Sequence, residues 1–184
     1  LAAGGINFEN NFFTAATGKQ ELTKLRAERC LAYDQVPLVE MDGLHLVQGS
    51  ATATYLGTRL GLLPSDPRES YIAQHVFASS QDARACMVGF PFADYPAVPT
   101  PATYERVLAE CRGPRGLIGR YAGKWEAMLQ SGGPFFLGAT PSIGDVGVFE
   151  AIDYFKDVFG VDMFDQCFAP FPNLLKHYAA TKEL

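Results

Sequence analysis

The segment from Gln35 to Gly49 carries the polar groups with the clearest chemical use. Pro37 follows Val36, and only an X-Pro peptide bond adopts the cis form at low cost. A cis bond here would turn the N–H and C=O of Val36 outward from a sheet edge, where an extended peptide could pair with them. Gln48 precedes an expected helix start, whose free N–H groups favour an anion. A trans proline at the start of an ordinary strand is the alternative, which the neighbouring hairpin and Gln48 make the weaker one.

The four cysteines could in principle bind a metal or form disulfides, but their spacing supports neither use. They lie far apart, with no Cys-x-x-Cys pair and no histidine close enough in sequence to complete a zinc motif, at Cys30, Cys86, Cys111 and Cys167. We therefore expect four reduced thiols in a cytoplasmic protein and no metal site. A free catalytic cysteine stays open as an alternative.

A small α/β part must position these groups, and an all-helical part follows it. Residues 36–41 and 44–47, joined by Asp42-Gly43, have the pattern of a β-hairpin. Apolar periodicity predicts the other elements: a strand over 6–13, helices over 20–26 and 50–60, a linker over 62–67, and helices over 68–88, 103–130, 142–159 and 172–181. Strand and helix signals precede the linker, whereas only helix signals follow it. This change predicts two domains, residues 1–63 and 64–184.

Two local signals shape the helical part. Gly113-Pro114 should break or kink the helix over 103–130. Ser142 and Asp145 have the spacing of a capping box, with Asp in place of Glu. We interpret this pair as a folding signal and not as catalytic chemistry.

Composition excludes several classes of partner. The 184 residues include 15 Lys+Arg and 20 Asp+Glu, a formal charge of -5 with no block of like sign. Such a chain does not attract phosphate backbones, so we expect no nucleic-acid partner. Charges, Gly or Pro interrupt every apolar run before the roughly 20 residues of a membrane span. We expect a soluble protein.

A family resemblance rests on residues 35–51, which read QVPLVEMDGLHLVQGSA. This segment resembles the glutathione site of cytosolic glutathione transferases, closest to the alpha, sigma and related Tyr-dependent classes. The α/β-then-helical order, the linker near Pro64 and the Ser-x-x-Asp box fit the same family. The resemblance implies a thioredoxin-like N-terminal domain, whose first strand is missing from this chain, and an all-helical C-terminal domain.

The resemblance also implies glutathione as substrate and a set of residues around it. The cysteine backbone of glutathione would pair with Val36, and its γ-glutamyl carboxylate would face Gln48 and the helix start. The implied residues are Arg26, Gln35, Val36, Pro37, Gln48, Gly49, Ser50, Asp82 and Arg120. Gly49 departs from the usual Ser or Thr, whose hydroxyl adds a hydrogen bond worth about 1 to 3 kcal/mol, unless Ser50 substitutes. Arg26, Asp82 and Arg120 have surface ions as their alternative reading.

The second substrate and the assembly are implied in the same way. The resemblance places the wall of a pocket for a hydrophobic electrophile at Val88, Gly89 and Phe92, near Phe90, Pro91 and Tyr95. Ordinary core is the alternative, which we favour for Phe90. Tyr33 falls where an aromatic key enters the partner subunit, and Asp82 where a carboxylate meets the γ-glutamyl ammonium of the neighbour. These two positions predict a homodimer; an exposed loop tyrosine is the alternative for Tyr33.

The catalytic residue is unknown from this sequence. In the family, a Tyr or Ser hydroxyl at the end of the first strand stabilises the glutathione thiolate, and that strand would lie upstream of Leu1. The opening Leu-Ala-Ala-Gly-Gly resembles a last helical turn and its C-cap, so we expect an N-terminally incomplete chain.

Two functions remain open. The first is a cytoplasmic detoxification enzyme, a glutathione transferase that conjugates or isomerises hydrophobic electrophiles. The second is a catalytically silent docking module in a larger assembly. Retention of the Gln35, Val36, Pro37, Gln48 and Asp82 set favours the first, because a pure scaffold has no need of it.

Overall fold

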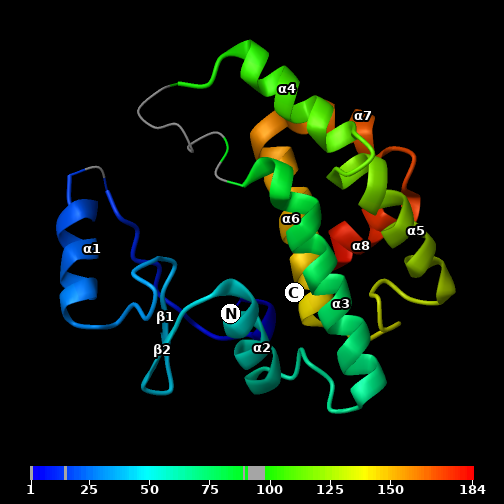
Figure 1. The fold of residues 1–184 in the computed structure, drawn as a ribbon. Helices are drawn as coiled ribbons and strands as arrows, with labels where there is room; N and C mark the ends of the chain where they lie inside the picture. The colour runs from blue at the N-terminus through cyan, green and yellow to red at the C-terminus, as the bar shows by residue number, and fades with distance from the viewer. Residues whose placement is uncertain (1, 15, 89, 91–97) are drawn as a thin grey trace.

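The computed structural model describes residues 2–14, 16–88, 90 and 98–184 (Figure 1). We call residues 2–63 the N-terminal region and residues 64–184 the helical region, after the boundary predicted above. The N-terminal region contains η1 (Ala2–Gly4), α1 (Gly18–Ala27), β1 (Val39–Met41), β2 (Leu44–Leu46) and α2 (Gly49–Arg59). The helical region contains α3 (Pro67–Arg84), η2 (Ala85–Met87), α4 (Pro101–Arg112), η3 (Leu117–Ala122), α5 (Gly123–Met128), η4 (Leu129–Ser131), α6 (Ile143–Phe159), α7 (Val161–Phe168) and α8 (Pro172–Lys182).

The predicted hairpin is confirmed. β1 and β2 pair antiparallel, with Val39 opposite Leu46 and Met41 opposite Leu44. The turn places Asp42 at φ 54° and Gly43 at φ 75°. Two successive positive φ angles are those of a type I′ turn, whose twist matches that of the strands and which Asp-Gly favours. The sequence of the turn therefore fixes the register of the hairpin.

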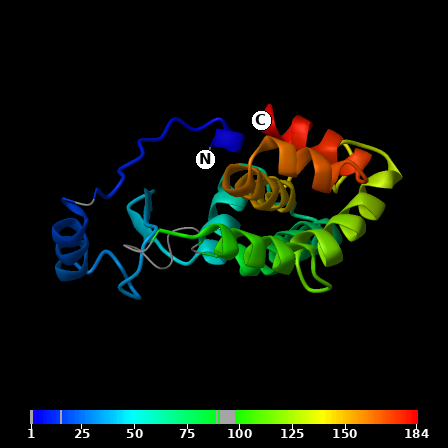
Figure 2. The same cartoon turned by 90° about the horizontal axis from the view of Figure 1, so that it is seen from above.

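The predicted strand over 6–13 is wrong. These residues run as an extended trace without ladder pairing from η1 to α1 (Figure 2). Among the described residues the sheet has two strands, β1 and β2, and neither pairs with this segment. Alternating apolar residues form a strand only beside a partner, and here Phe8 and Phe12 are exposed, Phe12 by 80%.

The helical region follows the predicted order with two differences. The break at Gly113-Pro114 is confirmed: α4 ends at Arg112, and a π-helical turn, η3, begins at Leu117. The predicted helix over 68–88 ends earlier, as α3 followed by the short 3₁₀ turn η2. The helix α7 was not predicted, because eight residues directly after Gly160 carry too short a periodic pattern. Its inward face nevertheless buries Phe164 and Phe168.

The core of the helical region forms around α3 and α6, which lie side by side (Figure 1). One continuous cluster joins buried residues of α3 to α8, including Val76, Trp125, Phe155 and Phe168. The two central helices approach closely because α6 has glycine at the contact. A Cβ on Gly144 would lie 2.8 Å from the carbonyl oxygen of Ala73.

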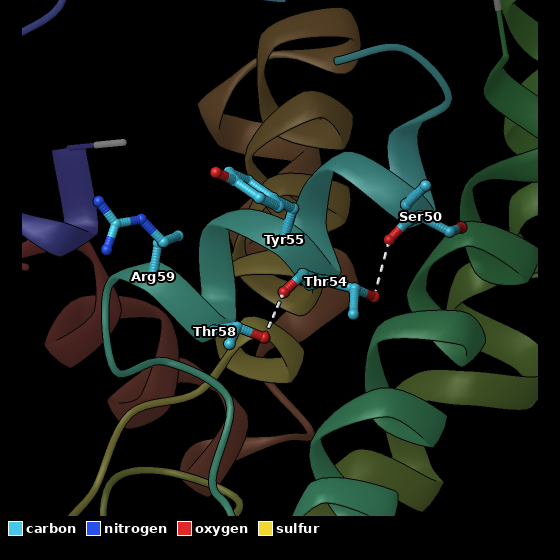
Figure 3. Close-up of a pocket in the computed structure, with 6 residues that line it drawn as sticks. Ser50, Thr54, Tyr55, Thr58 and Arg59 are labelled. Atoms are coloured by element: carbon cyan, nitrogen blue, oxygen red, sulfur yellow. Dashed lines mark hydrogen bonds between the residues drawn. The ribbon is translucent and has the colours of Figure 1, made fainter. Parts of the chain in front are cut away.

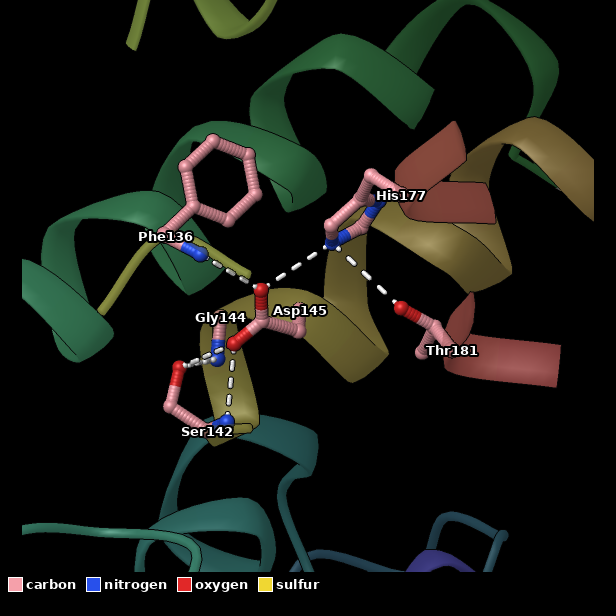
Figure 4. A network of polar contacts seen from close by, with 6 residues as sticks. All are labelled: Phe136, Ser142, Gly144, Asp145, His177 and Thr181. Atoms are coloured by element: carbon pink, nitrogen blue, oxygen red, sulfur yellow. Dashed lines mark hydrogen bonds and ion pairs between the residues drawn. The ribbon is translucent and has the colours of Figure 1, made fainter. Parts of the chain in front are cut away.

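The capping box of α6 is confirmed and continues into a buried network (Figure 4). Both Asp145 and His177 are fully buried. The Asp145 carboxylate accepts hydrogen bonds from the Ser142 N–H at 2.8 Å, the Phe136 N–H at 2.9 Å and the Ser142 hydroxyl at 2.7 Å, and contacts His177 Nε2 at 3.0 Å. His177 Nδ1 has no partner among the described residues. One carboxylate thus joins the start of α6, the loop before it and α8.

A second, smaller cluster joins the two regions. Leu62, Ala73 and Ile143 are its buried members. The Ile143 N–H donates to the Leu62 carbonyl at 2.9 Å. Gly57 of α2 lies so close to α6 that an added Cβ would be 2.5 Å from Ile143 Cγ2. The start of α6 is therefore the point at which the N-terminal region is attached.

The described part of the chain offers neither a membrane-spanning helix nor a group of metal ligands. None of its helices is both long and apolar enough to cross a lipid bilayer. In the same residues no three His, Cys, Asp or Glu side chains gather as ligands for a metal ion.

Candidate functional site

The Val36–Pro37 peptide bond is cis, as the sequence predicted. Val36 lies directly before the hairpin and is 45% exposed. Neither its N–H nor its C=O has a hydrogen-bond partner among the described residues. Both groups are therefore available to an extended ligand along this edge.

Gln48 and the start of α2 lie at the same end of the hairpin as Val36. Residues 39 and 46 are opposite each other in the ladder, so the residues just before β1 and just after β2 leave it together. Gln48 is the N-cap of α2 with φ 69°, and its side chain makes no capping hydrogen bond. Among the described residues, the side-chain amide of Gln48 and the first N–H groups of α2 have no partner, so they are free for an anion.

Gly49 and Ser50 open α2 and are exposed. A Cβ added to Gly49 would have no atom within 4 Å. The glycine is therefore not required by packing, and a side chain would fit there. Ser50 borders a groove of about 590 Å³ along α2, lined also by Ala51, Thr54, Tyr55, Thr58 and Arg59 (Figure 3).

A cluster that the sequence analysis missed ties the hairpin turn to α2. The Tyr55 hydroxyl donates to Asp42 Oδ2 at 2.7 Å, and Arg59 Nε donates to the same oxygen at 2.8 Å. Both hydrogen bonds lower the pKa of Asp42, and the one from Arg59 has the larger effect. The available signal was the spacing of Tyr55 and Arg59, four residues apart on one helix face, opposite a turn aspartate.

Arg26 has a partner of its own. Its Nη2 and Nε donate to the carbonyl oxygen of Asp34 at 2.7 and 3.1 Å. This bidentate contact holds the loop directly before Gln35 and Val36, and Gln35 itself is exposed. Arg26 therefore lies beside the predicted site, but its guanidinium is bound to the backbone of the loop before Gln35.

Asp82 and Arg120 are not brought to the hairpin within one chain. Asp82 lies exposed on α3, and its carboxylate has no hydrogen bond or ion pair among the described residues. The Arg120 guanidinium lies 5.4 Å from the centroid of the Tyr121 ring. Tyr33 is 64% exposed in the loop after α1. These three residues are accessible. The predicted roles of Tyr33 and Asp82 across a subunit interface, and that of Arg120 at the glutathione site, stay predictions.

The predicted wall for a second substrate is only partly described. Val88 is 63% exposed at the end of η2. Gly89 and Phe92, like Pro91 and Tyr95, lie outside the described residues. Phe90 is buried, with its ring 4.8 Å from that of Tyr104, and its carbonyl accepts from the Tyr154 hydroxyl. Its assignment to the core is confirmed.

Comparison with known sequences gives a consistent result. A family profile described as Glutathione S-transferase, C-terminal domain, matches residues 115–184. The chain is 31% identical to glutathione S-transferase alpha-4 of Rattus norvegicus over 159 residues, which is 86% of this chain and 67% of the relative. It is 34% identical to the glutathione S-transferase of Antechinus stuartii over 155 residues, which is 83% of this chain and 64% of that relative.

Solved structures agree on the fold. The pi-class glutathione S-transferase of Onchocerca volvulus superposes with a TM-score of 0.72 at 16% identity, covering 98% of this chain and 77% of the other. The glutathione S-transferase of Ascaris lumbricoides gives a TM-score of 0.72 at 19% identity, covering 99% and 82%. These likenesses show a thioredoxin-like part followed by a helical domain. With the alpha-class sequence relatives, they establish that the chain belongs to the glutathione S-transferase family.

Proposed function

We propose that this chain binds glutathione at the Val36 end of the hairpin and acts in glutathione transfer. The observation that carries the proposal is the unpaired backbone of Val36, before a cis proline, at the same hairpin end as Gln48 and the free N–H groups of α2. Family membership supplies the ligand. The cysteine backbone of glutathione would pair with Val36, and its γ-glutamyl carboxylate would accept from Gln48 and the start of α2.

The chemistry that this arrangement serves is attack by the glutathione thiolate on a hydrophobic electrophile. With an aryl halide, the sulfur forms a bond to the ring carbon and the halide leaves with the electron pair of its bond. The residues proposed here bind and orient glutathione; none of them is assigned to the stabilisation of the thiolate. Val88, with Gly89 and Phe92, is the proposed contact for the electrophile.

We further propose a cytoplasmic homodimer with a site completed by the partner. Asp82 is exposed and unpaired among the described residues. Its carboxylate is therefore able to bind the ammonium group of glutathione held by the partner subunit. The exposed ring of Tyr33 is the other proposed interface residue. Sedimentation at micromolar concentration tests this proposal. A monomer that still binds glutathione would remove the proposed roles of Asp82 and Tyr33.

Titration calorimetry with reduced glutathione tests the site. Gln48→Ala should weaken binding by about 1 to 3 kcal/mol, roughly 5- to 150-fold, because it removes a hydrogen bond to a charged carboxylate. Gln20→Ala is the matched control, since Gln20 is an exposed glutamine of α1 that is not among the residues proposed to bind glutathione. Equal affinities of the two variants would contradict the proposed site.

Gly49→Ser sharpens the same test. The position has space for a side chain, and a hydroxyl there can donate to the carboxylate that Gln48 holds. We expect tighter glutathione binding by about 1 kcal/mol, roughly fivefold. If affinity is unchanged, Ser50→Ala decides the reason: weaker binding by Ser50→Ala would mean that Ser50 already supplies the hydroxyl, and no effect of either variant would place the carboxylate elsewhere.

The docking module is the second candidate, and the missing hydroxyl at Gly49 favours it. It predicts no heat of glutathione binding to the chain and no effect of Gln48→Ala. Conjugation to an aryl halide must be assayed on the full-length protein, because no residue of the 184 is assigned to the thiolate. A full-length protein that binds glutathione without conjugating it would be a binding module without the chemistry.

A further inference from the structure

Two cysteine thiols meet where the end of α3 packs against α4. The Sγ atoms of Cys86, in η2, and Cys111, near the end of α4, are 3.4 Å apart. This separation exceeds a disulfide bond by only about 1.4 Å. All four cysteines of the chain are free thiols in the structure. The pair is therefore a dithiol close to bonding distance.

The two thiols differ in access and in acidity. Cys86 is half-buried, whereas Cys111 is fully buried. A hydrogen bond from the Cys111 thiol, helped by a backbone hydrogen bond from Leu117, lowers the pKa of Cys86 to about 7, against the opposing effects of burial and of the Glu110 carboxylate. The same hydrogen bond and burial raise the pKa of Cys111. Cys86 is thus the more accessible and more acidic of the two thiols, and Cys111 is the hydrogen-bond donor that favours the thiolate of Cys86.

The other two cysteines lie in different surroundings. Cys30 is buried in the N-terminal region, with its Sγ 3.9 Å from the Glu28 carbonyl oxygen. Cys167 is buried on α7, where its Sγ accepts from Arg112 Nη2 at 3.3 Å. No described cysteine other than Cys86 and Cys111 has a second sulfur of cysteine within hydrogen-bond reach. They serve as internal controls.

We propose that Cys86 and Cys111 are a peroxide-oxidisable pair, in which Cys86 attacks and Cys111 resolves. The Cys86 thiolate attacks one peroxide oxygen, the O–O bond breaks, and the departing hydroxide takes a proton, which leaves a sulfenic acid on Cys86. The Cys111 sulfur then attacks the Cys86 sulfur. The S–O bond breaks, and the hydroxide leaves as water with the proton of Cys111. Two electrons pass from the thiols to the peroxide.

The bond would join two elements that the chain separates by 25 residues. It would fix η2, directly after α3, to the last turn of α4. Asp82 lies one helical turn before Cys86, so the oxidised and reduced chains would differ at the end of the helix that carries this carboxylate. Formation of the bond does not require bound glutathione, because neither sulfur belongs to the residues proposed for that site.

Oxidation of the full chain with hydrogen peroxide tests the proposal. The expected product is an intact mass lower by about 2 Da, and a non-reduced peptide map in which Cys86 is linked to Cys111 while Cys30 and Cys167 still react with iodoacetamide. A disulfide to Cys30 or Cys167, a disulfide between two chains, or four free thiols after treatment would each overturn it.

Variants separate the two roles. Cys111→Ser should leave a sulfenic acid on Cys86 that dimedone captures, and Cys86→Ser should give neither the adduct nor the disulfide. Cys30→Ser is the matched control and should oxidise as the native chain does, because Cys30 lies in the N-terminal region and acts on neither thiol of the pair. Circular dichroism of each reduced variant establishes that it is folded. Dimedone capture mainly on Cys111 or Cys167 would reverse or remove the assignment.

The pH dependence of alkylation gives a second readout. Iodoacetamide should modify Cys86 with a midpoint near pH 7. At pH 7 its reaction should be roughly threefold faster than that of an equally accessible ordinary thiol, since the larger thiolate fraction outweighs its lower nucleophilicity. Cys111→Ala should move the midpoint to higher pH, because the hydrogen bond to the thiolate is lost. An unshifted midpoint would show that Cys111 does not tune Cys86.

Discussion

The two regions of this chain bury their apolar residues to very different extents. In the helical region one cluster runs continuously from α3 to α8 around Trp125 and Phe155. In the described part of the N-terminal region only four residues are buried: Cys30, Leu31, Gly57 and Leu62. Burial of apolar surface is the main source of stability, so the helical region holds itself together. The N-terminal region, which carries the proposed site, is held by hairpin pairing, the Asp42 contacts and its attachment to α6.

This difference predicts that the two regions respond separately to substitution. Changes in the α6 network should unfold the molecule, changes at the junction should loosen the N-terminal region, and changes at the hairpin should remain local.

The largest effect is expected for Asp145→Ala. The substitution removes the acceptor shared by Ser142, Phe136 and His177, all inside the helical core. Leaving several buried donors without a partner should destabilise the fold by about 3 to 5 kcal/mol. Urea unfolding followed by circular dichroism measures this. Asp66→Ala is the matched control, because Asp66 caps α3 at an exposed site and should cost about 1 kcal/mol. Equal losses would mean that the buried network adds nothing beyond a cap.

A smaller effect is expected for Gly57→Ala. The new Cβ would meet Ile143 Cγ2 at 2.5 Å and force α2 away from α6. Overpacking of this kind costs about 1 to 3 kcal/mol. Hydrogen exchange should speed up in α2 and the hairpin while α3 and α6 stay protected. Uniform acceleration throughout the chain would contradict the separation of the two regions.

The smallest effect is expected for Asp42→Asn. Asparagine keeps the turn geometry but removes the charge that Arg59 and Tyr55 hold. Because the folded pKa of Asp42 is lowered, its carboxylate stabilises the hairpin above the ordinary value of 3.8, and this stabilisation is lost as the pH falls through the lowered pKa. The ratio of variant to native hydrogen-exchange rates at β1 and β2 should therefore exceed one at pH 6 and approach one in acid. A ratio independent of pH would exclude the charge as its cause.

Local signals predicted the elements that depend on few residues. Asp42-Gly43 predicted the turn, Gly113-Pro114 the end of α4, and Ser142 with Asp145 the start of α6, because each acts through its own backbone. The strand over 6–13 failed because pairing needs a partner strand, which alternation in one segment cannot supply.

In the candidate site, too, some features could be predicted from contiguous residues and others depended on the folded structure. The cis bond at Pro37 and the position of Gln48 followed from a motif of contiguous residues. The hold of Arg26 on the Asp34 carbonyl did not, because a side chain chooses among nearby acceptors only once the loop has folded. The hydrogen bonds from Tyr55 and Arg59 to Asp42, which we call the Asp42 clamp, did not follow from the sequence either. They join a turn to a helix face, and no single segment encodes that pairing.

That clamp has a mechanical consequence. The hairpin and α2 are joined covalently near Gln48, close to the ligand-facing backbone. They are joined a second time where Asp42, in the hairpin turn, binds Tyr55 and Arg59 of α2, so the two elements form two sides of a triangle that these hydrogen bonds close. In such a triangle the angle near Gln48 is set by the length of the opposite side. Side chains at positions 55 and 59, which contact no ligand in this proposal, would then adjust the width available to glutathione, and affinity could be tuned by remote substitution without any change to the binding groups.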